Sequence, residues 1–89
     1  MSSPRAYSQD TLAIMDRFFV AFTACVEQGL IKTAKDFCET NNIARPHFYA
    51  QRKHRGRGFF EAGWLSILVR DYGVSANWLL TGKGTMFVQ

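Results

Sequence analysis

The chain has 89 residues, of which 47% are hydrophobic and 20% charged, a balance that predicts one soluble globular domain rather than a disordered segment. It contains no apolar run of about 18 residues and no secretory-signal pattern at its start, so we expect a cytoplasmic protein without a membrane span. The two cysteines and two histidines lack metal-site or disulfide-framework spacing, and no catalytic grouping of side chains is present. We therefore expect neither enzymatic activity nor a cofactor, a metal or a small-molecule ligand.

The positive charge is concentrated in one segment. Residues 41–60 contain no acidic residue and five basic ones, so they carry +5, and the other six basic and seven acidic residues leave −1, for a net charge of +4. A basic segment on a near-neutral body is typical of a protein that binds a polyanion. A basic surface that meets only solvent is the alternative, and charge alone leaves both open.

A long first helix is predicted after an aperiodic start. Residues 1–9 are expected to form a flexible arm, and the domain is expected to span 10–89. Ser8 or Asp10 caps the helix, which runs to Gln28 and ends at Gly29. Its apolar residues form two adjacent rows with spacings of three and four residues. The first row is Leu12, Met15, Phe19, Phe22 and Val26, and the second is Ile14, Phe18, Ala21 and Cys25.

Two short helices joined by a tight turn are predicted next. Thr33 is a good N-cap for a helix over 34–40. Asn41 and Asn42 follow, and asparagine tolerates the left-handed conformation that a turn between helices needs. A third helix is predicted from residue 44 or 45 to about residue 53, with a proline in its first turn.

The rest of the chain completes an all-α pattern. The Arg-Gly-Arg-Gly segment at 55–58 is a loop by composition. A fourth helix is predicted over 61–72, followed by Gly73, and a fifth over 76–80, followed by Gly82. No alternating pattern predicts a strand, so the expected fold is all-α with five helices.

The second and third helices have the spacing of a helix-turn-helix, which can present its second helix at the protein surface. Phe48 is expected to anchor that helix inward, with Ala44 pointing the same way. Arg45, Tyr49 and Lys53, at i, i+4 and i+8, share another face. That face is free to enter a DNA major groove, where arginine can bind guanine through two hydrogen bonds.

The C-terminal segment carries a family resemblance. Residues 72–84, YGVSANWLLTGKG, resemble the last part of the DNA-binding domain of phage CI-type repressors, in the lambda-repressor-like helix-turn-helix superfamily. Residues 33–53 are similar to the helix-turn-helix of that family, although Gln51 stands at a position that is often apolar. The resemblance implies a compact five-helix fold whose second and third helices form the DNA-reading unit.

The resemblance also implies which residues meet DNA. It places Arg45, Tyr49, Ala50 and Lys53 on the groove-facing side of the third helix, and Thr33 and Lys35 at a phosphate-contacting helix start. His47, Arg52, Arg55 and Arg57 are further expected contacts, because they lie at the ends of the third helix or in the loop after it. Alternatives stay open: His47 can be solvated, Tyr49 can pack on a neighbouring helix, and Arg52 and Lys53 favour the helix macrodipole in any case.

These features predict a sequence-specific double-stranded DNA-binding regulator of transcription, expected to be a nucleoid-associated repressor of bacterial or phage origin. The alternative is a helical protein-interaction module, antitoxin-like or an accessory adaptor, whose basic surface meets an acidic protein. A homodimer is expected, because helix-turn-helix proteins usually pair two half-sites. Two surfaces are candidates for the dimer contact: the second apolar row of the first helix, which is expected to be exposed if the small body covers only one row, and the apolar tail at 86–88. The alternative is that the body covers the first helix and that the tail packs on its own core.

Overall fold

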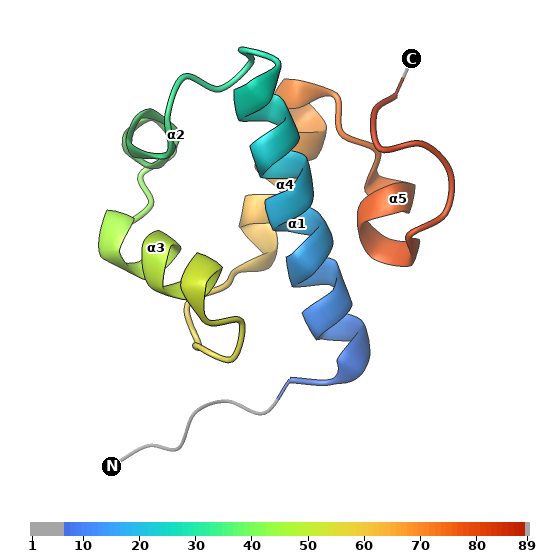
Figure 1. Ribbon diagram of the computed structural model, residues 1–89, viewed down its shortest axis with the longest axis horizontal. Coiled ribbons are helices and arrows are strands. Elements are labelled where there is room, and N and C mark those ends of the chain that lie inside the picture. The colour runs from blue at the N-terminus through green and yellow to red at the C-terminus, as the bar shows by residue number, and fades with distance from the viewer. Residues whose placement is uncertain (1–6, 89) are drawn as a thin grey trace.

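The computed structural model describes residues 7–88, and these form five α-helices. In chain order they are α1 (Gln9–Glu27), α2 (Ala34–Thr40), α3 (Arg45–Lys53), α4 (Ala62–Tyr72) and α5 (Ala76–Thr81) (Figure 1). Within this range no strand forms, and an isolated antiparallel bridge joins Val74 to Phe87. The predicted all-α class with five helices is confirmed, and the helix bounds lie close to the predicted ones.

The expected N-terminal arm is only partly described. Residues 1–6 of that arm lie outside the described residues. Gln9, which the arm was expected to include, is already the first residue of α1, because Ser8 accepts a hydrogen bond from the Thr11 N–H and caps the helix. The Tyr7 hydroxyl donates to the carbonyl of Arg57 at 3.0 Å, so the start of the described chain lies beside the loop after α3.

Short-range signals in the sequence explain where the helices begin and end. The hydroxyls of Thr33 and Ser75 accept hydrogen bonds from backbone N–H groups in the first turns of α2 and α5. Gly73 and Gly82 follow α4 and α5 with φ angles of 71° and 77°, a left-handed conformation that glycine adopts without steric cost.

Helix α1 lies at the centre of the molecule, against α4 and α5. Figure 1 shows α2 and α3 on one side of α1 and α5 on the other. Phenylalanine rings fill the space between the elements: Phe22 of α1 lies 5.1 Å from both Phe37 of α2 and Phe48 of α3, between ring centroids. Phe48, with no exposed surface, is the point where α3 joins the core.

The central position of α1 means that both of its apolar rows are buried. The expectation of an exposed second row is wrong, since Phe18, Ala21 and Cys25 have no exposed surface and Ile14 is half-buried. The first row is also inside, with Met15, Phe19 and Phe22 buried, because helices pack on α1 from more than one direction. This face of α1 therefore has no exposed row for a dimer contact.

The apolar tail packs back onto its own domain. The Ser75 N–H donates to the Met86 carbonyl and the Val88 N–H to the Gly73 carbonyl, each at 2.8 Å. Met86 and Phe87 are half-buried against the core, and Val88 is 66% exposed. Of the tail residues expected to make a dimer contact, Val88 alone is substantially exposed.

None of the helices formed by the described residues has the length and hydropathy needed to cross a membrane.

Candidate nucleic-acid interface

Helices α2 and α3 form a hairpin whose turn is made by two asparagines. Asn42 has a φ of 56°, the left-handed conformation predicted for it. The Asn41 side-chain amide donates to the Phe37 carbonyl at 2.9 Å and so closes the end of α2. Ile43 follows and packs against the core, with its N–H bonded to the Cys38 carbonyl at 2.9 Å. These contacts hold α3 at a definite position beside α2.

The start of α3 differs from the sequence prediction at one residue. Ala44, expected to point inward with Phe48, is exposed. It is the N-cap of α3 and has extended backbone angles, so helical spacing does not reach back to it. The connection between α2 and α3 therefore spans residues 41–44, one residue longer than a three-residue turn.

Two residues of α3, three positions apart, are buried in the core. Phe48 and Gln51 have no exposed surface, and Ala50, expected at a DNA contact, is half-buried. The other side chains of α3 are exposed: Arg45, Pro46, His47, Tyr49, Arg52 and Lys53. The helix is anchored along one stripe and leaves most of its circumference open.

The exposed side of α3 is basic. Arg45 and Lys53 stand at its two ends, and no hydrogen bond or ion pair formed within residues 7–88 involves either side chain. Tyr49, 38% exposed, lies between them at helical spacing. The Arg52 guanidinium lies 5.6 Å from the centroid of the Tyr49 ring, a cation–π contact that keeps both side chains along the helix.

The loop after α3 adds a second part to this surface. The imidazole ring of His47 stacks on the ring of Phe59, with centroids 4.1 Å apart and planes 4° from parallel. The Arg57 guanidinium lies 5.1 Å from the centroid of the same Phe59 ring. Residues expected separately at the helix start and in the loop are thus brought together by an aromatic residue that sequence reasoning missed. In the sequence, the one indication of this role of Phe59 is its place in an aromatic pair, residues 59–60, directly after the basic glycine-rich loop at 55–58. We call Arg45, His47, Tyr49, Arg52, Lys53 and Arg57 the basic surface.

Arg55 is directed away from the basic surface and toward α1. Its Nε donates to Oδ1 of Asp16 at 2.8 Å, and its guanidinium lies 4.5 Å from the centroid of the Phe19 ring. It also donates to the Arg52 carbonyl. In the structure Arg55 therefore attaches the loop to α1, and its expected contact with DNA stays a prediction.

The start of α2 offers a smaller contribution than expected. The Thr33 hydroxyl is engaged as a helix cap, accepting from the Asp36 N–H at 3.0 Å, and the Lys35 side chain is exposed. Asp36 and Glu39, also exposed on α2, offset the charge of Lys35. Positive charge is therefore concentrated on α3 and its loop.

The described part of the chain contains two cysteines and no grouped metal ligands. No group of three His, Cys, Asp or Glu side chains in residues 7–88 could hold a metal ion. Cys25 and Cys38 are free and buried, and burial raises the pKa of both thiols. A protonated, inaccessible thiol is a poor nucleophile, so both cysteines act as small hydrophobic side chains.

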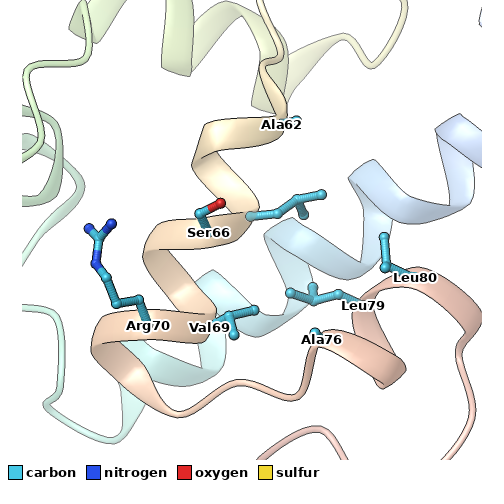
Figure 2. Close-up of a pocket in the computed structure, with 8 residues that line it drawn as sticks. Ala62, Ser66, Val69, Arg70, Ala76, Leu79 and Leu80 are labelled. Atoms are coloured by element: carbon cyan, nitrogen blue, oxygen red, sulfur yellow. The ribbon is translucent and has the colours of Figure 1, made fainter.

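An apolar groove between α4 and α5 lies on the side of the molecule away from α3. Figure 2 shows its lining, with Val69 of α4 and Leu79 of α5 directed toward each other, Leu80 farther along α5, and Ser66 and Arg70 on α4. Its volume is about 390 Å³. In Figure 1, α5, which forms one wall of this groove, lies on the other side of α1 from α3.

Fold and surface together define a small five-helix protein with a basic helix exposed at one side. No protein-family model matches the chain, and no curated protein or solved structure matches it either.

Proposed function

We propose that this protein is a sequence-specific double-stranded DNA-binding regulator of transcription that places α3 in the major groove. The observation that carries the proposal is the division of α3 into a stripe buried at Phe48 and Gln51 and an exposed basic side. An α-helix with side chains is about 10–12 Å wide, and the major groove of B-DNA is about 12 Å wide. A helix anchored along one stripe at the edge of a fold fits that groove.

The arrangement of charge supports DNA over an acidic protein as the partner. Exposed cations lie at both ends of α3, and Arg57 extends the surface through the loop. Base edges in the groove can be reached from the start of a recognition helix, while flanking cations meet phosphates. The alternative of an acidic protein partner would be supported if the chain bound no duplex at low salt.

The two ends of α3 are expected to make different kinds of contact with DNA, one to a base and one to a phosphate. Arg45→Ala removes a guanidinium at the start of the helix, where it can bind guanine, so it should weaken binding to the preferred site by about 1–3 kcal/mol and relax preference at one base pair. Lys53→Ala should weaken binding to all sequences alike. Selection from a random duplex library with each variant, followed by affinity measurement, separates the two results.

The matched control for these variants is Lys83→Ala. Lys83 is exposed and follows α5 by two residues, and Figure 1 shows α5 on the other side of α1 from α3. Removing Lys83 should leave base preference unchanged, and it should lower affinity only by the small effect of one distant charge. Equal, sequence-independent losses for Arg45→Ala and Lys53→Ala would make Arg45 a phosphate contact and leave base reading by α3 without support.

We also propose that the protein binds DNA as a homodimer. A single short recognition helix reads only a few base pairs, and paired half-sites one helical turn apart, about 34 Å, supply the missing selectivity. Sedimentation at micromolar protein with a duplex carrying two half-sites is expected to give two copies bound cooperatively. A duplex with one half-site is the control. One copy at a time, with no cooperativity on the paired site, would contradict the dimer.

A further inference from the structure

We propose that Gln51 is a positioning residue for DNA binding, whose buried amide holds the loop of residues 54–59 so that Arg57 and His47 complete the basic surface. The inference rests on the proposed function and assigns a role to a residue that makes no DNA contact itself, since Gln51 has no exposed surface.

The Gln51 amide bonds to both ends of the loop. Its Nε2 donates to the Arg55 carbonyl at 2.9 Å, and its Oε1 accepts from the Phe59 N–H at 2.9 Å. Nε2 also lies 3.4 Å from Sδ of Met15 on α1. One side chain of α3 therefore fixes the start and the end of the segment that carries Arg57.

These two backbone groups depend on Gln51. No other hydrogen bond to the Arg55 carbonyl or the Phe59 N–H is formed within residues 7–88. Inside the loop the structure has one backbone bond, from the Arg57 N–H to the His54 carbonyl at 3.1 Å. With glycines at 56 and 58, such a loop has a large conformational entropy to lose, and an anchor that orders it before DNA arrives lowers the cost of binding.

The bond at Phe59 links the anchor to the basic surface. Gln51 holds the Phe59 backbone, the Phe59 ring stacks on His47 of α3, and Arg57 lies against the same ring. Displacing Phe59 therefore displaces the ring on which the His47 imidazole and the Arg57 guanidinium rest. Burying an amide costs more free energy than burying an apolar side chain unless the amide forms its hydrogen bonds. The bonds to the loop are therefore what makes a buried glutamine favourable at this position.

The test uses Gln51→Met, which keeps length and volume and removes both loop bonds, alone and combined with Arg57→Ala. We expect Gln51→Met to lower affinity for duplex DNA about three- to tenfold and to make the slope of log K against log salt shallower by about 0.9, the contribution of one phosphate contact. In the Arg57→Ala background the same substitution should have a clearly smaller further effect, because the guanidinium that Gln51 positions is already gone and only the stack of His47 on Phe59 remains to be displaced. In the absence of DNA, amide hydrogen exchange at Phe59 should be faster in Gln51→Met than in the wild-type chain.

Two further variants serve as the control and the backup for this test. Gln28→Met, at the exposed C-cap of α1, is the matched control and should leave affinity unchanged. Gln51→Leu removes the same two loop bonds with an apolar side chain of similar size, and it serves as the second variant if Gln51→Met does not fold. Wild-type affinity for Gln51→Met, or an equal loss with and without Arg57, overturns the positioning role. A wild-type chain that binds no duplex instead overturns the proposed function, while Phe59 exchange still reports on the anchor.

Discussion

Phe48→Ala is expected to unfold the domain or bring it close to unfolding. The Phe48 ring has no exposed surface and is surrounded by rings of three other helices. Its centroid lies 5.1 Å from that of Phe22, 5.7 Å from that of Phe37 and 5.3 Å from that of Trp64. Truncating such a side chain costs about 3–5 kcal/mol. Small domains have a free energy of unfolding near the lower end of about 5–15 kcal/mol, so most of the stability is lost.

Thermal unfolding followed by far-UV circular dichroism measures this effect. Each kcal/mol shifts the melting temperature of a domain of this size by about 4–8 °C, so a fall of more than about 10 °C is expected. Tyr49→Ala is the matched control, because Tyr49 is the next residue but is 38% exposed, and its loss should leave the melting temperature within a few degrees. A Phe48→Ala variant with normal melting that fails to bind DNA would place the ring on the binding surface.

DNA binding is expected to weaken about 150-fold between 50 and 200 mM salt. Four cations of the basic surface, Arg45, Arg52, Lys53 and Arg57, are exposed and carry no ion pair within the described residues. If each meets one phosphate and releases the associated counterions, log K falls against log salt with a slope of about −3.6 per protomer. Arg55 is left out of this count because its guanidinium pairs with Asp16.

Fluorescence anisotropy with a labelled duplex at several salt concentrations gives the slope. Arg57→Ala should make it shallower by about 0.9. Arg70→Ala is the control, because Arg70 is exposed but pairs with Asp71 at 2.9 Å on α4, away from the basic surface. A slope near zero for the wild-type chain would leave no electrostatic contact with phosphates and would contradict the DNA proposal.

Local features of the chain were sufficient to predict the helices and the anchoring of α3. Ser8, Thr33 and Ser75 cap helices with their own side chains, and Gly73 and Gly82 end helices through their own backbone angles. Such signals act within a few residues, so they can be read without knowing what lies nearby in space. The burial of Phe48 and the shared exposure of Arg45, Tyr49 and Lys53 follow in the same way from helical periodicity.

The sequence by itself therefore determined the five helices, the basic character of α3 and the residues at its two ends. Only the tertiary structure decided that both rows of α1 are covered, that Arg55 pairs with Asp16, and that Gln51 and Phe59 organise the loop. Two of these features depend on groups far along the chain: Arg55 and Asp16 are 39 residues apart, and α1 is enclosed by segments on both sides of it in space. The bond between Gln51 and Phe59 spans only eight residues, but it forms only when the loop between them folds back onto α3. Periodicity tells which side chains share a face, but which charged or polar group meets a partner depends on packing between distant segments.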